Sequence, residues 1–463
     1  MKKENFYRIY AAAFIGVCLV PAVGTPFFKG DAAKEKSELA KFPSLVQEGK
    51  INVNFFDEFE TYFSENFAFR QQLVNADGRL KSALTHTSAN DDVIVGKDGW
   101  LYYNETISDF QRINTLKIRE INGIANNLRI IDKYCKIKGA DFIFFSAPNK
   151  NTLYPENMPY NYIQTDKKSN LENLTETLSA DDFYMDMKSQ LEALNSSTAL
   201  YHKTDTHWNN FGAYAAHTML MNKLGKGSCG VGNGWYTAND RLGDLAAMLY
   251  PVEDAKDMQL HNDYEYEYTY TSRFRGLDDV SITTENLNAA GNLIMFRDSF
   301  GEAILPYMAE QFATAEFSRA VPYNLTKVKE GDSVIIELVE RNLGNLLKSA
   351  PVMEAPVVGV FDIEAEKGDS SDAVLKIAEN NGMTHIYGIL PESFFKGENY
   401  RIIVEAEGTS FEAFNCFEEN QLKEYKCNSY GFSLYLPKET NTDIIKVTVL
   451  NENIGAVYTE FLN

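Results

Sequence analysis

The feature that most constrains the fold of this chain is a series of short, continuous apolar runs that alternate with helical patterns. Apolar residues recur with helical spacing over 118–138, and the run from Ala140 to Ser146 that follows is typical of a strand buried on both faces. The same alternation returns at 210–224, 292–296, 301–312 and 333–339. It predicts an α/β fold in which helices flank a mostly parallel sheet, with ligands gathered at the carboxyl ends of its strands.

The pattern changes near Pro351, where short strand candidates separated by Gly, Asn and Asp replace the alternation. We expect an all-β sandwich from there to the end of the sequence. The predicted organisation has four parts, namely an anchor or signal segment, a polar stalk, the α/β domain and the β-sandwich, at 1–28, 29–50, 51–350 and 351–463.

Positive charge and an apolar run occur together at the N-terminus. Basic residues near the start precede a mostly apolar stretch from Ile9 to about Phe28, roughly the 20 residues needed to span a bilayer. We therefore expect a single N-terminal anchor in the cell membrane, with the rest of the chain outside the cytoplasm. Small residues at 22–24 keep a cleaved signal segment open as the alternative, and the protein would then be secreted.

The charge and cysteine content of the 463 residues exclude some partners. There are 44 Lys and Arg against 65 Asp and Glu, a net charge of −21 that repels nucleic acid. The five cysteines include no Cys-x-x-Cys pair, so we expect no zinc site. Cys416 and Cys427 lie in the same strand-rich region and could form a disulfide, but isolated buried thiols are an equal alternative.

Two polar segments carry residues suited to acyl transfer. The first, Tyr201 to Asn209, holds Asp205 and His207 just before an amphipathic helix. An irregular loop there lets the carboxylate bind one imidazole nitrogen and leaves the other nitrogen to act as a base. The second segment holds Ser299, where a buried strand turns directly into a helix. The Ser299 N–H would then point, with the helix dipole, toward an oxyanion formed at an attacked carbonyl.

Each of these residues also has a structural interpretation. Asp205 and Ser299 could simply cap the helices that follow them. Trp208, beside the histidine, could pack in the core instead of stacking on a sugar. The chain has only six histidines, which favours a functional interpretation for a histidine near an Asp in a polar loop.

Further groups that could hold an oxyanion are polar residues that follow other predicted strands. Asn149 and Lys150 follow a buried strand and should lie at the same sheet edge as Ser299. Arg319 and Asn324 are additional candidates after another strand, and a structural role is the alternative for all four. The Ser299 N–H remains the first donor that we would name.

Two motifs around these residues carry a family resemblance. Asp205-Thr206-His207-Trp208 is followed by Asn-Asn-Phe-Gly-Ala-Tyr-Ala-Ala and, further on, by Arg297-Asp298-Ser299-Phe300-Gly301. Other matching segments occur in the same order at 63–70, 96–103, 147–150, 154–156 and 336–341. Together they resemble the alginate O-acetyltransferase group and its DHHW relatives, within the SGNH hydrolase-like superfamily.

This resemblance implies that Asp205, His207 and Ser299 form a catalytic triad in the chain order Asp, His, Ser. Thr206 departs from the DHHW pattern, which has a histidine at that position. Arg297 stands where the family pattern has the Gly of Gly-Asp-Ser, so it becomes an additional candidate for contact with the substrate.

The implied activity is that of an extracytoplasmic O-acetyltransferase that needs no metal or other cofactor. His207 would remove the proton of Ser299, which takes an acetyl group from an ester or thioester donor and passes it to a sugar hydroxyl. A membrane-bound O-acyltransferase is expected to supply the acetyl groups, and an exopolysaccharide or a cell-wall glycan to receive them. The resemblance also implies that the β-sandwich could hold the glycan, as a carbohydrate-binding module does in some relatives, and a spacer or a dimerisation domain is the alternative. A carbohydrate acetylesterase with the same triad and a non-catalytic glycan-binding protein are the alternatives.

Overall fold

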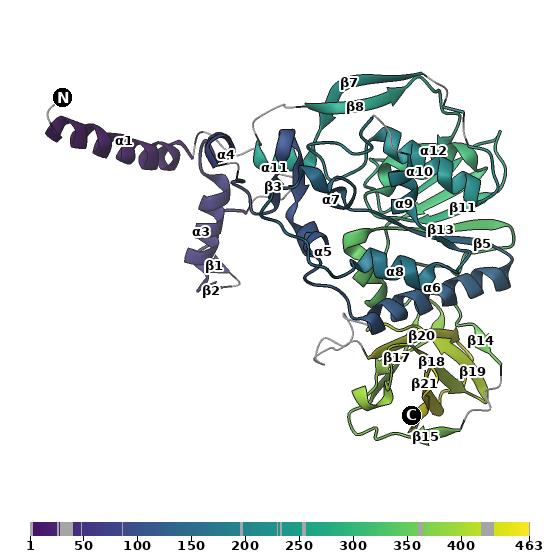
Figure 1. The fold of residues 1–463 in the computed structure, drawn as a ribbon. Coiled ribbons are helices and arrows are strands. Elements are labelled where there is room, and N and C mark those ends of the chain that lie inside the picture. The colour runs from purple at the N-terminus through teal and green to yellow at the C-terminus, as the bar shows by residue number, and fades with distance from the viewer. Residues whose placement is uncertain are drawn as a thin grey trace.

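At the centre of the computed structural model is a seven-stranded, mostly parallel sheet (Figure 1). The structure describes residues 3–25, 27, 40–47, 49–85, 87–194, 198–228, 230–231, 234–251, 256–359, 364–417 and 430–462. The strand order is β6-β5-β13-β11-β12-β10-β9, with bounds Tyr184–Met185, Asp141–Ala147, Asp332–Val339, Asn292–Phe296, Thr314–Ser318, Ser281–Glu285 and Thr269–Tyr270. The first five strands run parallel, and β10 and β9 pair antiparallel. The predicted α/β class with its mostly parallel sheet is confirmed.

Helices cover both faces of this sheet. On one face lie α9 (Met187–Ala193), α10 (Asn210–Lys223) and α12 (Gly301–Gln311), and on the other lie α6 (Ile118–Lys138) and α8 (Asn170–Leu178) (Figure 1). Ile143 and Phe145 of β5 join the first core, and Phe142 and Phe144 join the second. Successive side chains of a strand point to opposite faces, so a strand covered on both sides is mostly apolar.

Two hairpins and several short helices lie over the carboxyl edge of the sheet. The elements are β3 (Val93–Val95), η1 (Lys97–Gly99), β4 (Leu101–Tyr103), η2 (Asn104–Thr106), α5 (Ile107–Gln111), α7 (Lys150–Leu153), η3 (Pro155–Asn157), β7 (Trp235–Leu242), α11 (Asp244–Leu249), β8 (Lys256–Asn262) and η4 (Glu340–Leu347). β3 pairs with β4 and β7 with β8, both antiparallel. Most of these elements follow a strand of the sheet or contact the loop at 201–209. They therefore surround the carboxyl ends of the parallel strands, where open α/β sheets bind their ligands.

The C-terminal region is a sandwich of two sheets. One sheet has the order β14-β19-β18-β21-β22-β15 and the other β16-β17-β20, and side chains of both form one core. In chain order the bounds are Val357–Val358, Ala365–Lys367, Val374–Asn380, Met383–Ile389, Tyr400–Ala406, Thr409–Ala413, Gly431–Pro437, Ile444–Asn451 and Gly455–Leu462 for β14 to β22, with η5 at Glu392–Phe394. The predicted β-sandwich is confirmed, while a domain boundary at residue 350 stays a prediction.

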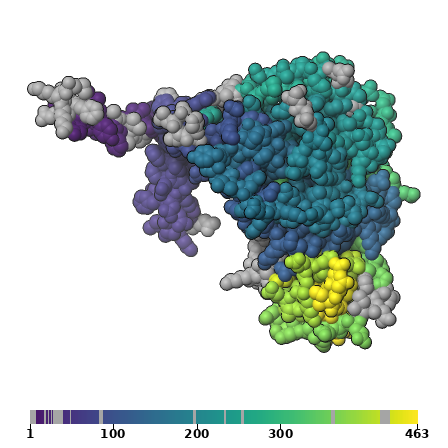
Figure 2. Space-filling model, viewed as in Figure 1, coloured from purple at the N-terminus to yellow at the C-terminus, as the bar shows by residue number. Residues whose placement is uncertain are grey.

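The sandwich is attached to the α/β part through α6. Asn127 Nδ2 donates to the carbonyl oxygen of Asn415 at 2.9 Å, and Asn126 Nδ2 donates to that of Tyr400 at 2.8 Å. In the space-filling view the sandwich, in light green to yellow, lies directly against the blue residues of this helix (Figure 2). The two parts therefore share a contact surface that includes buried polar groups.

The N-terminal elements form an arm that projects from the body (Figures 1 and 2). They are α1 (Lys3–Gly24), β1 (Val46–Gln47), β2 (Lys50–Ile51), α3 (Phe55–Asn66) and α4 (Arg70–Thr85). No helix among the described residues is long and apolar enough to cross a bilayer. The expected N-terminal membrane anchor, and the localisation inferred from it, are therefore wrong.

The reason lies in the length of the helical apolar segment. α1 ends at Gly24, so the part of the expected anchor that starts at Ile9 is helical for about 24 Å, against the roughly 30 Å of a hydrocarbon core. The first turn of α1 adds Lys3 and Glu4, which are charged.

Three earlier expectations fall partly or wholly outside the described residues. Most of the predicted polar stalk lies there, as do Cys229 and Cys427. The proposed disulfide between Cys416 and Cys427 is therefore not tested, and Cys416 itself is buried.

Candidate functional site

Ser299 lies in the tight turn between β11 and α12. Asp298 shapes this turn, because its Oδ1 accepts the Phe300 N–H at 2.9 Å and its Oδ2 accepts the Val339 N–H of β13 at 2.8 Å. The turn is thereby tied to the neighbouring strand. Neither bond uses the Ser299 side chain, which is half-buried at the carboxyl edge of the sheet.

The loop that carries Asp205 and His207 is held at its ends by a β-bridge and along its backbone by a lysine side chain. Tyr201 and Trp208 form an isolated antiparallel bridge that closes the loop. Lys150 Nζ donates to three backbone carbonyls of the loop, among them that of Asp205 at 2.7 Å. An irregular segment is thus kept in one conformation, which the chemistry of a positioned histidine requires.

His207 bridges Asp205 and Ser299. Its Nδ1 lies 2.7 Å from Asp205 Oδ1, and its Nε2 lies 2.8 Å from Ser299 Oγ. Asp205 is fully buried, and its Oδ2 accepts a hydrogen bond of 2.7 Å from Arg241. Although burial opposes the charged form, the hydrogen bond from His207 and the charges of His207 and Arg241 hold the pKa of Asp205 well below its usual value.

The protonation of His207 follows from these contacts. An ionised carboxylate can only accept, so Nδ1 of His207 carries the proton that Asp205 binds. Nε2 then has a lone pair, and it faces the hydroxyl of Ser299. The arrangement can therefore remove the hydroxyl proton and make the oxygen a nucleophile.

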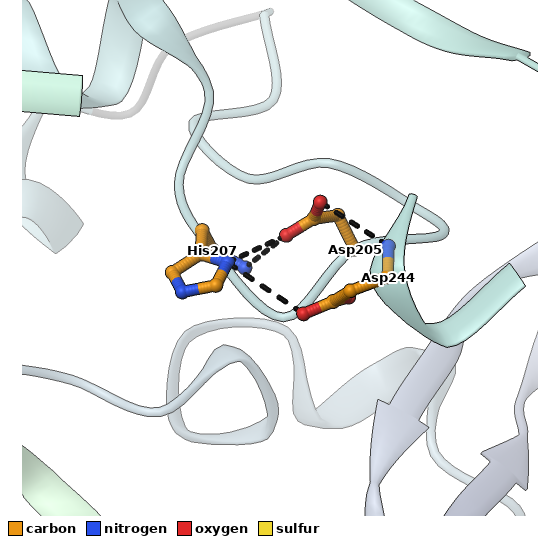
Figure 3. Close-up of side chains that lie close together, drawn as sticks. All are labelled: Asp205, His207 and Asp244. Carbon is orange, nitrogen blue, oxygen red and sulfur yellow. Dashed lines mark hydrogen bonds and ion pairs between the residues drawn. The ribbon is translucent and has the colours of Figure 1, made fainter. Parts of the chain in front are cut away.

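A second carboxylate, that of Asp244, lies beside the first (Figure 3). Its Oδ2 is 3.7 Å from His207 Nδ1. Among the described residues, Asp205, His207 and Asp244 are the group that could offer three ligand atoms to a cation, all within 4.8 Å of one another. A cation would compete with Arg241 for Asp205 and would need Nδ1 without its proton, so the arrangement fits hydrogen bonding better than metal binding.

Two donors at this edge of the sheet have no hydrogen-bond acceptor in the part of the chain that the structure describes. They are the backbone N–H of Ser299 and the guanidinium of Arg341. Arg341 follows β13, and its Cζ lies 5.6 Å from the centre of the Tyr103 ring and 5.7 Å from that of Phe300. The His207 ring packs on Phe300 as well, with 4.9 Å between centroids. Both donors are available for a negative charge that develops on an acyl oxygen.

Three residues predicted to contact the substrate or the oxyanion have structural roles instead. Trp208 is 1% exposed and donates from Nε1 to the carbonyl of Phe300 at 3.0 Å, so it packs in the core, which was the alternative to stacking on a sugar. Asn149 is fully buried, and its N–H donates to Glu340 at 2.9 Å. Lys150 Nζ donates its hydrogen bonds to the loop carbonyls, and burial lowers the pKa of Lys150 to about 7.

The other three candidates are also occupied. The Arg297 side chain turns away to the carbonyl of Leu277, at 2.5 Å, and it packs so close to Gly301 that a Cβ there would lie 2.6 Å from it. Arg319 pairs with Glu302 at 3.2 Å. Asn324 accepts from the backbone and hydroxyl of Thr326, at 3.1 and 2.6 Å, and so closes its own turn. The expected contacts of these three with substrate are therefore not supported by the geometry.

Sequence reasoning missed three charged residues of this site. Arg241 lies at the end of β7 and Asp244 at the start of α11, and no local pattern connects them with the loop that they contact. Arg341 did carry a signal, because it follows a predicted strand at the same sheet edge as Ser299. Asn149 was predicted because it follows a buried strand, and the same reasoning applies to Arg341.

Residues 93–279 match the family model described as "SGNH hydrolase-like domain, acetyltransferase AlgX". That segment is similar to the SGNH hydrolase-like domain of AlgX, and the resemblance to the alginate O-acetyltransferase group is confirmed for it.

Curated relatives agree with this assignment. The chain is 23% identical over 218 residues to a probable alginate O-acetylase AlgJ of Pseudomonas syringae pv. tomato, covering 46% of this chain and 51% of the relative. It is 24% identical over 205 residues to the corresponding protein of Pseudomonas aeruginosa, covering 44% and 48%. The chain thus spans about half the length of the curated relatives it matches.

Solved structures include similar chains. PatB1 of Bacillus cereus is 17% identical with a TM-score of 0.43, over 54% of this chain and 96% of that one. A DHHW family protein from Eubacterium siraeum is 15% identical with a TM-score of 0.41, over 50% and 90%.

Proposed function

We propose that this protein transfers an acetyl group, through an acetylated Ser299, to a hydroxyl of a polysaccharide. The observation that carries the proposal is the hydrogen-bonded line from Asp205 through His207 to Ser299, with distances of 2.7 and 2.8 Å. The match to an acetyltransferase family model supports acyl transfer as the class of chemistry.

In the first half of the proposed reaction, Ser299 Oγ attacks the carbonyl carbon of an acetyl ester or thioester. His207 Nε2 takes the hydroxyl proton, and Asp205 stabilises the imidazolium that forms. The Ser299 N–H and the guanidinium of Arg341 hold the negative charge of the tetrahedral intermediate. The intermediate then expels the donor's oxygen or sulfur, which receives the proton from His207, and acetyl-Ser299 remains.

In the second half, a sugar hydroxyl gives its proton to His207 and attacks acetyl-Ser299. The second tetrahedral intermediate collapses to an acetylated sugar and the free Ser299 hydroxyl, which recovers its proton from His207. This sequence needs no redox step and no further co-reactant.

The acceptor and the donor extend the proposal beyond the site itself. An exopolysaccharide or cell-wall glycan is the proposed acceptor, and the name alginate O-acetylase borne by the curated relatives supports a polysaccharide. The proposed acetyl source is a membrane-bound O-acyltransferase, which would hand the acetyl group to Ser299.

The test uses the full chain with 4-nitrophenyl acetate, alone and with candidate oligosaccharides, followed by mass spectrometry of the sugars. We expect acetylated sugar and faster nitrophenol release when a suitable acceptor is present. Release that no glycan changes, with acetate as the only product, would replace the proposal with a carbohydrate acetylesterase. The side chain of His207 is 19% exposed, so water can reach the base in such an enzyme.

A control separates enzyme from binding protein. A fluorophosphonate probe should label the parent chain at Ser299 and leave Ser299→Ala unlabelled. Equal labelling of the two chains would remove Ser299 as the nucleophile. No labelling of either, together with binding of an oligosaccharide, would indicate a glycan-binding protein that has lost its triad chemistry.

A further inference from the structure

The Nδ1 side of His207 has more acceptors than one carboxylate provides. Asp205 Oδ1 is 2.7 Å away and Asp244 Oδ2 is 3.7 Å away, and both carboxylates are drawn in Figure 3. Thr206 Oγ1 is 3.1 Å away. A triad needs only one acceptor at this nitrogen. The presence of two further oxygens therefore needs an explanation.

Thr206 connects Asp244 to the imidazole. Its hydroxyl is 2.5 Å from Asp244 Oδ2, and because the carboxylate can only accept, the hydroxyl proton is donated there. The lone pairs of Thr206 Oγ1 are then left for the Nδ1–H of His207. The hydrogen bond to Asp244 polarises the Thr206 hydroxyl and makes its oxygen a better acceptor for the same nitrogen that Asp205 binds.

The position of Asp244 is fixed by backbone contacts. Its Oδ1 accepts the Thr206 N–H at 2.8 Å, and its own N–H donates to Asp205 Oδ2 at 3.3 Å. Gly243, just before it, packs against the loop so closely that a Cβ would lie 2.2 Å from the Thr204 carbonyl oxygen. Asp244 Oδ1 thus holds the loop, while Oδ2 is turned toward the histidine.

Charge explains why a second carboxylate is useful here. The guanidinium of Arg241 binds Asp205 Oδ2 through two nitrogens, at 3.0 and 2.7 Å, and offsets the negative charge of Asp205. An imidazolium that forms at His207 would therefore face a carboxylate whose charge is already balanced. Asp244 supplies a second negative charge on this side of the imidazole, and Arg241, whose charge also acts on Asp244, makes its hydrogen bonds to Asp205.

We propose that Asp244, acting through Thr206, is a positioning residue that stabilises the imidazolium form of His207 during acyl transfer. The proposal rests on the function proposed above. The charged and titratable groups that face His207 directly or through one neighbour are Asp205, Asp244, Ser299, Arg241 behind Asp205, Lys150 on the Asp205 carbonyl, and Arg341 across the Phe300 ring.

The test is the rate of Ser299 labelling by the fluorophosphonate probe as a function of pH, which needs neither donor nor glycan. Asp244→Asn keeps an oxygen for the Thr206 N–H and removes the charge. We expect the plateau rate to fall about tenfold, which is the effect of destabilising the imidazolium by the equivalent of one pKa unit. The acid limb should move to lower pH, since a less favourable imidazolium leaves the base neutral in more acidic solution.

Asp257→Asn is the matched control, because Asp257 binds the Thr204 N–H and hydroxyl, at 2.8 and 3.1 Å, in the same loop. Its acid limb should stay with that of the parent. Thr206→Ser should resemble the parent and Thr206→Val should resemble Asp244→Asn, which keeps the test decisive even where Asp244→Asn folds poorly.

Several results would overturn the inference. The first is a labelling rate whose acid limb and plateau are unchanged in both Asp244→Asn and Thr206→Val. The second is a shift of the acid limb in Asp257→Asn equal to that in Asp244→Asn. The third is loss of labelling on treatment with EDTA, which would make Asp205, His207 and Asp244 the ligands of a cation. A parent chain that is not labelled at Ser299 would instead remove the proposed function, so the two failures are distinguishable.

Discussion

Two turns at the same edge of the central sheet have opposite uses. The turn after β11 carries Ser299, and the turn after β5 carries Asn149 and Lys150. Both follow a buried parallel strand, both lead into a helix, and both hold polar side chains. Only the first holds a hydroxyl that is hydrogen-bonded to His207, together with a backbone N–H that has no acceptor among the described residues.

The difference lies in where each turn finds its hydrogen-bond partners. After β11, Asp298 shapes the turn with its own side chain, so Ser299 is not needed for that purpose. After β5, Glu340 takes the Asn149 N–H, and Lys150 Nζ is consumed by three loop carbonyls. A place at the carboxyl edge thus predicts proximity to the site, while the neighbouring acceptors decide whether a residue does chemistry or holds the fold.

The largest expected effect is at the β11 turn. Ser299→Ala should lower acetyl transfer at least about 1,000-fold, because the nucleophile is lost. Its free energy of unfolding should stay within about 0.5 kcal/mol of the parent, since the hydroxyl is half-buried and bonds to His207 alone. Transfer assays and denaturant unfolding measure the two quantities. Activity above a hundredth of the parent value would contradict the chemical role of this turn.

Arg341 should show the next largest effect. Arg341→Met should lower nitrophenol release about 100-fold, as loss of an oxyanion donor does, with little change in stability because the guanidinium binds no protein acceptor among the described residues. Arg341→Lys, which keeps the charge, should recover part of the rate. Equal rates for the Met variant and the parent would leave the Ser299 N–H as the only donor that we propose.

The sheet that carries both turns could be predicted well from the sequence. β5, β11 and β13 are mostly apolar because both of their faces are covered, so the sequence marks their positions directly. β9 and β10 at the edge of the sheet are partly exposed and have no such pattern. The N-terminal expectation failed because apolar composition alone does not fix where a helix ends.

The site could be predicted only where its residues sit in a local pattern. Asp205 and His207 share one loop, and Ser299 sits at a strand-to-helix junction, so each could be named from its neighbours in the chain. Arg241 and Asp244 reach the loop only because the β7 hairpin folds back over it, which no short-range pattern encodes. The buried positions of Asn149 and Lys150 likewise depend on tertiary partners.

A smaller effect on activity, but a larger one on stability, is expected at the β5 turn. Lys150→Met removes the side-chain donor of three loop carbonyls, of which only that of Lys203 keeps a second donor among the described residues, the Leu101 N–H, and it should lower the free energy of unfolding by about 2–4 kcal/mol. Transfer should fall about tenfold, because the loop that positions His207 loosens. Thermal unfolding and transfer assays provide the check. A variant that is as stable as the parent but inactive would show that Lys150 takes part in the reaction instead of holding the fold.

The smallest effect is expected from the partner of this turn. Glu340 is buried, and burial raises its pKa from 4.5 to about 7, against hydrogen bonds from Thr152 and the Asn149 N–H. A carboxyl whose pKa is higher in the folded than in the unfolded chain contributes stability below pH 4.5 and loses it as the pH rises toward 7. Glu340→Gln should remove that slope, about 1.4 kcal/mol per pH unit at most, and leave transfer at neutral pH nearly unchanged.

Denaturant unfolding between pH 4 and 8 measures the slope, and Asp109 provides the control. Burial raises the pKa of Asp109 to about 6, so Asp109→Asn should remove a separate slope that ends at a lower pH and should leave the slope due to Glu340 in place. If Glu340→Gln keeps the full slope of the parent, its carboxyl is not held neutral by burial. The Asn149 N–H would then be bound by a charged group, and the β5 turn would place a negative charge at the same sheet edge as the nucleophile.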